Sequence, residues 1–69
     1  VLRQERVQRL QQALTQLSAR DRTLFYRKYY YLQSTARIAA ELGTTERAVE
    51  GRLYRIRKRL QTLLGGDAL

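Results

Sequence analysis

Apolar residues recur along most of this chain at steps of three and four, the spacing that gathers side chains on one face of an α-helix. The first such stripe predicts a helix over about residues 2–17, formed by Val7, Leu10, Leu14 and Leu17. A second helix is predicted over about residues 19–30, with an apolar face of Leu24, Phe25 and Tyr29. Ser18 has the chemistry of its N-cap, and Asp21 lies where a carboxylate meets free backbone amides. The two apolar faces should pack together and begin the core.

Two more helices follow, separated by a sharp turn. Ser34 can cap a short third helix, and Gly43 sits where a left-handed C-terminal cap is expected. The apolar members of this helix are Ile38, Ala39 and Leu42. Thr44 or Thr45 caps the fourth and longest helix, which ends at the glycine pair 65–66. Its apolar stripe is Val49, Leu53, Ile56, Leu60 and Leu63.

A short helix, a tight turn and a longer helix form the arrangement of a helix-turn-helix. Ala39 and Ala40 are small enough for the two helices to cross closely, as that motif requires. The chain has no Pro and no linker-like stretch, so residues 1–69 are predicted to form one continuous domain. The expected fold class is all-α, a four-helix domain of the winged-helix-like type with a helix-turn-helix and a long C-terminal recognition helix.

Charge is concentrated on the last helix. The chain carries 14 Lys and Arg against 6 Asp and Glu, a formal net charge of +8. Between residues 47 and 59, Glu50 is the single acid. The cations of that stretch are Arg47, Arg52, Arg55, Arg57, Lys58 and Arg59. A basic helix of this kind is typical of a domain that binds a polyanion such as DNA.

The residues that the chain lacks narrow its function. With no Cys and no His, it offers no disulfide framework, no Cys/His zinc site and no histidine acid–base catalyst. It has no glycine-rich phosphate loop and no nucleophile–base pair, so we expect neither an enzyme nor a bound cofactor. No apolar run approaches the roughly 18 residues of a membrane span. We therefore expect no membrane insertion and a cytoplasmic location.

Helical spacing sends a distinct set of side chains to the outer face of the last helix when Val49 and Leu53 turn inward. These candidates for DNA contact are Arg47, Glu50, Gly51, Tyr54, Arg55 and Lys58. An arginine can bond a guanine edge or a phosphate, and Tyr54 can stack on a sugar or reach a phosphate. Arg57 and Arg59 are assigned to the phosphate backbone.

The segment from Ser34 to Leu60, STARIAAELGTTERAVEGRLYRIRKRL, resembles region four of bacterial sigma factors, particularly those of the extracytoplasmic-function group. Upstream, residues 13–25, ALTQLSARDRTLF, are similar to the family's AL..LP.R.R.VF segment. The resemblance implies a domain that binds the upstream promoter hexamer, the minus-thirty-five element, with its last helix. It also implies docking on the flap of the RNA polymerase β subunit, and masking by an anti-sigma factor.

Functional positions can be carried over from the family one by one. The resemblance assigns the DNA-facing positions to Arg47, Glu50, Gly51, Tyr54 and Arg55. Lys28, Ser34 and Thr35 would hold the flanking phosphates. The family's apolar positions, which the periodicity independently places in the core, fall on Leu24, Phe25, Ile38, Ala39, Leu42, Val49 and Leu53.

The chain departs from the family at several positions of the motif. Arg37 stands where Glu usually precedes Ile-Ala, and Glu50 stands where Lys or Arg is common. Our hypothesis is that Arg37 and Glu50 face each other as a reversed ion pair, which would tie Glu50 to the protein instead of DNA. Gly51 stands where Ser is common, and a glycine inside a helix costs roughly 1 kcal/mol relative to alanine. Either its missing side chain lets the helix approach the bases, or an exposed glycine is tolerated there.

Other classes of protein remain open on these residues. The output domain of a LuxR-type response regulator is also a four-helix unit with a helix-turn-helix, although the long run 52–64 suits a sigma factor better. A protein-docking module and a basic helix lying on a membrane surface are further alternatives. Tyrosines 29–31 invite comparison with single-strand binders, but at least one ring is expected to close the core and another to pack beneath the following turn. A fragment of a full sigma factor and a stand-alone adaptor both fit the sequence.

Overall fold

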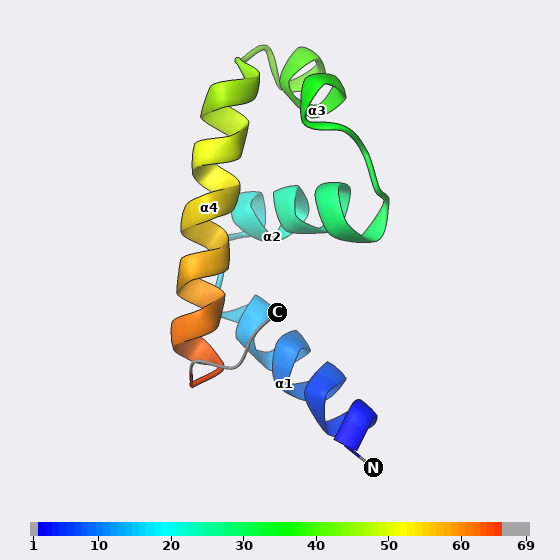
Figure 1. The fold of residues 1–69 in the computed structure, drawn as a ribbon, viewed down its shortest axis with the longest axis vertical. Coiled ribbons are helices and arrows are strands. Elements are labelled where there is room, and N and C mark those ends of the chain that lie inside the picture. Colours follow the sequence, from blue (N-terminus) through cyan, green and yellow to red (C-terminus); the bar gives the residue numbers. More distant parts are fainter. Residues whose placement is uncertain (1, 66–69) are drawn as a thin grey trace.

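The computed structural model describes residues 2–65, with side chains from residue 4 onward, and the regular structure of this part is entirely helical. The elements are α1 (Leu2–Thr15), α2 (Ala19–Phe25), η1 (Tyr26–Tyr30), α3 (Thr35–Leu42) and α4 (Glu46–Leu63). α3 lies at the N-terminal end of α4, α2 meets its middle and continues into η1, and α1 packs near its C-terminal end (Figure 1). The predicted all-α fold with a helix-turn-helix is confirmed. No helix of the described part is long and apolar enough to cross a membrane.

Three helices begin where the sequence offers a hydroxyl cap. Each side-chain oxygen accepts a hydrogen bond from the backbone N–H three residues further on, at 3.2 Å for Ser18, 3.1 Å for Ser34 and 3.1 Å for Thr45. Thr45, and not Thr44, is therefore the cap of α4. α3 ends at Gly43, whose φ of 68° is the left-handed conformation that glycine adopts without steric cost.

α1 ends at Thr15 and is therefore shorter than predicted. Beyond it, the backbone winds into a tighter turn. The N–H of Gln16 donates to the carbonyl of Ala13 at 3.0 Å. The N–H of Leu17 donates to the carbonyl of Leu14 at 3.1 Å. Such bonds over three residues close the last turn of a helix and turn the chain away. Leu17 is nevertheless buried, as predicted.

The second predicted helix has the predicted span but two different windings. At Tyr26, α2 gives way to η1, a π-helical turn in which the N–H of Tyr31 donates to the carbonyl of Tyr26 at 2.9 Å. The chain leaves η1 through Leu32, which has a φ of 56° although it is not a glycine. This conformation costs a residue with a Cβ about 1–2 kcal/mol. Leu32 regains little of that cost by burial, because it is 81% exposed.

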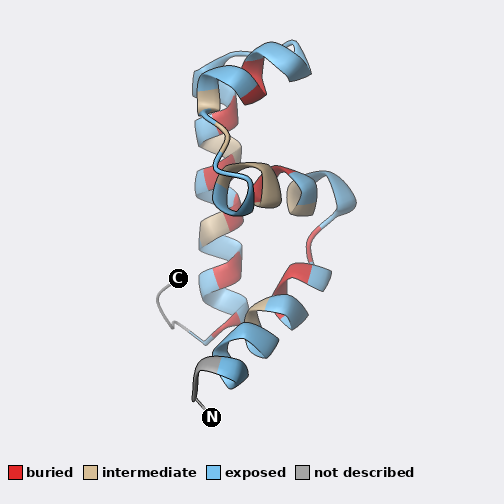
Figure 2. Cartoon of the chain, turned by 90° about the vertical axis from the view of Figure 1, so that its right-hand side faces the viewer, coloured by how far each residue is buried: buried red, intermediate tan, exposed pale blue. Residues whose placement is uncertain are grey.

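One core runs along the inner side of α4. Its members are Ala13, Leu14, Leu17, Leu24, Phe25, Ile38, Ala39, Val49, Leu53, Ile56, Leu60 and Leu64. Figure 2 shows buried stretches along α4 and on the segments packed against it. Ile38 and Leu60 have no exposed surface, so the core is closed at both the α3 end and the α1 end of α4. Burial of this apolar face fixes which side of α4 is presented to solvent.

Four apolar residues that the periodicity assigns to the core are exposed, and those predictions are wrong. Val7 is 49%, Tyr29 40%, Leu42 54% and Leu63 40% exposed. Val7 belongs to the half of α1 that projects away from α4 (Figure 1). Leu42 and Leu63 are the last residues of their helices, where the packing partner ends. Periodicity identifies the apolar face of a helix but not how far along that face a partner reaches.

Candidate nucleic-acid interface

The outer face of α4 carries most of the residues predicted to contact DNA. The exposed side chains there are Arg47, Glu50, Tyr54, Arg55 and Lys58. Residues four apart are neighbours on a helix surface, so Arg47, Gly51 and Arg55 form one row along this face. Gly51 is half-buried between the two arginines. Among the described residues, neither Arg47 nor Arg55 has an ion-pair or hydrogen-bond partner for its guanidinium.

Tyr54 and Lys58 lie one helical turn apart and contact each other. The ammonium nitrogen of Lys58 stands 5.6 Å from the centroid of the Tyr54 ring. A cation over a ring face at an exposed site contributes about 0.5–1 kcal/mol. The contact restrains both side chains on the outer face of α4.

The basic residues on the flanks of α4 are engaged by the protein itself. Nη2 of Arg52 lies 3.2 Å from Oδ1 of Asp21 on α2. Nη1 of Arg57 donates to the Tyr29 hydroxyl on η1 at 2.6 Å. Both arginines are half-buried, whereas Arg55 between them is exposed. Besides lying in the first turn of its helix as predicted, Asp21 therefore ties α2 to α4.

The predicted ion pair between Arg37 and Glu50 is wrong. Nε of Arg37 donates to Oε2 of Glu41, one turn further along α3, at 3.3 Å. Arg27 of η1 donates to the other oxygen of Glu41, and its Nε donates to Oε1 of Gln33 at 2.8 Å. Arg37 pairs with Glu41 and not with Glu50 because Glu41 lies four residues further along the same helix, where the two side chains are neighbours. Glu50 is left on the outer face with no partner among the described residues.

The residues assigned to the flanking phosphates lie on two elements. Ser34 is the exposed N-cap of α3, and Thr35 is the half-buried first residue of that helix. The start of a helix presents free backbone N–H groups and the positive end of the helix dipole, which favour a phosphate. Lys28 is half-buried on η1. The structure thus brings Ser34 and Thr35 together and places Lys28 on the element that precedes them.

Tyrosines 29–31 divide into two groups. Tyr29 packs against the buried Phe25, with ring centroids 4.9 Å apart, but it is 40% exposed. Tyr30 and Tyr31 are 71% and 65% exposed, so none of the three rings closes the core and that prediction is wrong. A π turn takes in an extra residue and changes the face on which the following side chains emerge. The sequence pattern assumed a regular α-helix and missed this change.

Gly51→Ala should stabilise the domain by about 0.5–1 kcal/mol, because alanine has less conformational freedom to lose in a helix. A Cβ at Gly51 meets nothing within 4 Å, so no clash opposes the gain. Urea unfolding measures the change. Gly43→Ala is the matched control, since its Cβ also meets nothing within 4 Å but its φ is +68°, and it should destabilise. A loss of stability on Gly51→Ala would contradict the open helical site. Unchanged duplex binding by that variant would remove the hypothesis of closer approach to the bases.

The comparisons with known proteins agree with this geometry. Residues 7–60 match the family model of sigma-70, region 4. The matched stretch contains α3 and the exposed residues of the outer face of α4. The chain therefore belongs to the sigma-70 region 4 family, whose members are DNA-binding domains of transcription initiation and not enzymes.

Curated relatives point to one group within that family. The ECF RNA polymerase sigma factor SigL of Mycobacterium tuberculosis, in three strains, is 50% identical to this chain over 42 residues. The aligned part is 61% of this chain and 24% of the relative. The chain thus spans about a quarter of the length of these curated relatives. No solved structure matches the chain.

Proposed function

We propose that this domain recognises the upstream promoter hexamer, the minus-thirty-five element, with α4 in the major groove of duplex DNA. The observation that carries the proposal is that the cations of α4 fall into two groups, those bonded within the protein and those exposed to solvent. The flanking Arg52 and Arg57 are engaged within the protein. Arg47, Arg55 and Lys58 are exposed together on the outer face. The major groove admits an α-helix, and a helix with one cationic, solvent-facing side suits it.

The outer face offers both base-reading and phosphate-binding groups. The guanidinium of Arg47 or Arg55 can donate two parallel bonds to O6 and N7 of guanine, or neutralise a phosphate. Glu50 can accept from a cytosine amino group, because no described residue competes for its carboxylate. Tyr54, restrained by Lys58, can reach a sugar or a phosphate.

Flanking phosphates complete the proposed interface. Ser34 and Thr35 would bind one phosphate at the start of α3, where the first N–H groups of a helix have no carbonyl partner within it. Lys28 would neutralise another from η1. Arg57 would reach the DNA backbone with the N–H groups that its bond to Tyr29 leaves available. Contacts of this kind fix the register of a protein on DNA without reading its sequence.

We also propose that the domain docks on the flap of the RNA polymerase β subunit, and that an anti-sigma factor can mask it. Both proposals are supported by membership of the region 4 family and by the relatives, which are ECF RNA polymerase sigma factors. The LuxR-type alternative draws no comparable support from the family match.

Selection from a randomised duplex library, at low and at moderate salt, tests the promoter proposal. The wild-type domain should enrich one hexamer, and Arg55→Ala should lose that preference, since one bidentate pair supplies about 1–3 kcal/mol of discrimination. Arg6→Ala is the control, because it removes an exposed cation from α1, at the opposite end of α4 from α3 (Figure 1), and should keep the preference. Absent or sequence-blind binding by the wild type would overturn the proposal in favour of a protein-docking module.

A further inference from the structure

Exposed apolar side chains gather around η1, on a different element from the outer face of α4. Tyr30 is 71%, Tyr31 65% and Leu32 81% exposed, and the three follow one another in sequence. Single exposed apolar residues are ordinary, whereas a contiguous group marks an interaction site. Together with the half-buried Tyr26, these residues are named the tyrosine patch.

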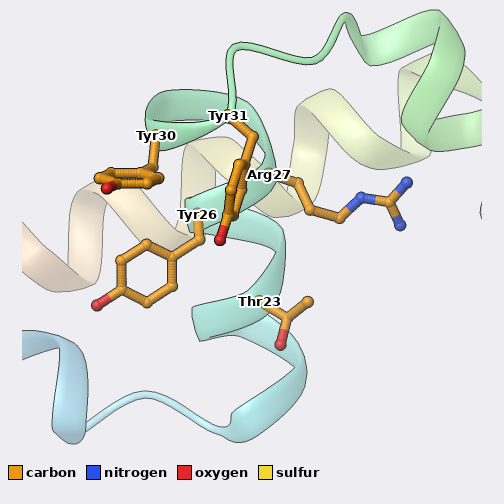
Figure 3. Close-up of a pocket in the computed structure, with 5 residues that line it drawn as sticks. All are labelled: Thr23, Tyr26, Arg27, Tyr30 and Tyr31. Carbon is orange, nitrogen blue, oxygen red and sulfur yellow. The ribbon is translucent and has the colours of Figure 1, made fainter.

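The tyrosine patch contains an open pocket. The pocket has a volume of about 420 Å³ and is lined by Thr23, Tyr26, Arg27, Tyr30 and Tyr31 (Figure 3). The Tyr30 ring stands at 87° to the Tyr26 ring, with centroids 6.2 Å apart. It stands at 81° to the Tyr31 ring, with centroids 5.0 Å apart. The Tyr30 ring therefore meets both of its neighbours edge to face, and the three rings form a corner at the pocket.

Two unusual backbone features build the patch. The π turn of η1 turns Tyr30 and Tyr31 outward, and Leu32 holds a left-handed φ of 56° at the exit. Glycine would take that conformation more cheaply than leucine, and the leucine side chain is not buried in exchange. A π turn and a strained, exposed apolar residue side by side are features that concentrate at binding sites. They indicate that the patch has an external partner.

The charge around the patch defines the chemistry of that partner. The cations of α2 and η1 are Arg20, Arg22, Arg27 and Lys28. The one acid of these elements, Asp21, is paired with Arg52 on α4. Arg27 is bonded to Glu41 of α3, and the remaining cations keep the surroundings positive. A cationic ligand is repelled by this environment, and an acidic one is attracted.

We propose that the tyrosine patch binds an acidic segment of a partner protein, which places one aliphatic or aromatic side chain in the corner between Tyr26, Tyr30 and Tyr31. Nucleic-acid bases are the weaker candidate, since bases stack on open ring faces and these rings pack against one another. The inference goes beyond duplex recognition and does not depend on it, because none of the residues of the tyrosine patch is assigned to DNA, although Lys28 on the same element is assigned to a phosphate.

A titration of the domain, followed by NMR, tests the inference. The probe is a short helical peptide with leucine on one face and glutamate on the other, and its counterpart with lysine for glutamate is the charge control. The glutamate peptide should bind and shift the resonances of residues 26–32, and the lysine peptide should not. Tyr31→Ser should weaken binding about tenfold, as truncation of a central aromatic side chain in an interface does. Leu42→Ser is the matched control, because Leu42 is 54% exposed but lies at the end of α3, and it should bind normally.

Leu32→Gly separates binding from folding. This variant should raise the thermal midpoint of the domain, because it relieves the left-handed leucine, and should lower peptide affinity several-fold. If Leu32 had only a structural role, the midpoint would rise and the peptide affinity would stay unchanged. The inference is overturned if both peptides bind alike, if Tyr31→Ser leaves the glutamate peptide unaffected, or if oligothymidine displaces that peptide. Concentration-dependent dimerisation abolished by Tyr31→Ser would assign the patch to a second copy of the chain instead.

Discussion

Leu60→Ala should cost the domain most of its stability. Leu60 has no exposed surface and lies in the half of α4 against which α1 packs (Figure 1). The link between these helices is reinforced by Arg9, which donates to the carbonyl of Leu64 at 3.3 Å. Truncation of a buried leucine costs about 2–5 kcal/mol. A native domain has about 0.05–0.15 kcal/mol per residue in total, so this change removes a large share of it. Thermal unfolding by circular dichroism should show a midpoint lowered by roughly 10–30 °C.

Leu63→Ala is the matched control for this prediction. Leu63 belongs to the same helix as Leu60 but is 40% exposed. Its truncation leaves a smaller cavity and removes less apolar surface, so the loss of stability should be well below that of Leu60→Ala. Equal losses from the two variants would mean that the last turn of α4 is packed differently from the structure, and would contradict the division of the stripe into buried and exposed leucines.

Local signals explain why much of the fold was predictable. Ser18 and Ser34 are confirmed as caps because a serine at the start of a helix acts on an N–H three residues away, within the same short segment. The prediction of a left-handed C-terminal cap at Gly43 is confirmed, because this conformation depends only on the absence of a Cβ at that residue. The burial of Val49 and Leu53 followed from helical spacing alone. Each of these predictions needed only residues within about one turn of each other.

Non-local packing explains what the sequence missed. The partners of Arg52 and Arg57 lie on α2 and η1, far away in sequence, so no spacing rule along α4 distinguishes these arginines from Arg55. The bond between Arg27 and Glu41 likewise depends on how η1 leads into α3. Leucine is not a residue type that predicts a left-handed conformation, so the positive φ of Leu32 could not be predicted from the sequence. The outer face of α4 could therefore be predicted from periodicity, but the separation of engaged from unengaged cations required the structure.

Exchanging both Arg47 and Arg55 for glutamine should abolish sequence-specific duplex binding while leaving the domain folded. Both side chains are exposed on one row of α4, and no described residue bonds their guanidinium groups. Removal of a base-reading arginine costs about 1–3 kcal/mol, so the double substitution should weaken binding to the selected hexamer roughly a hundredfold or more. Each phosphate that these arginines no longer neutralise should also make the negative slope of log affinity against log salt shallower by about 0.9. Fluorescence anisotropy of a labelled duplex, measured over a range of salt, gives both quantities.

Arg52→Gln is the matched control, because it removes the same charge from the same helix but from a residue that is paired with Asp21. It should lower the stability of the domain modestly, since the ion pair that joins α2 to α4 is removed, and should leave the salt slope nearly unchanged. Substitution of an outer-face arginine should therefore weaken DNA binding, whereas substitution of the ion-paired Arg52 should mainly lower stability. If Arg52→Gln weakens binding and flattens the salt dependence as much as either outer-face substitution does, net charge governs the affinity. The row formed by Arg47, Gly51 and Arg55 would then have no special part in reading DNA.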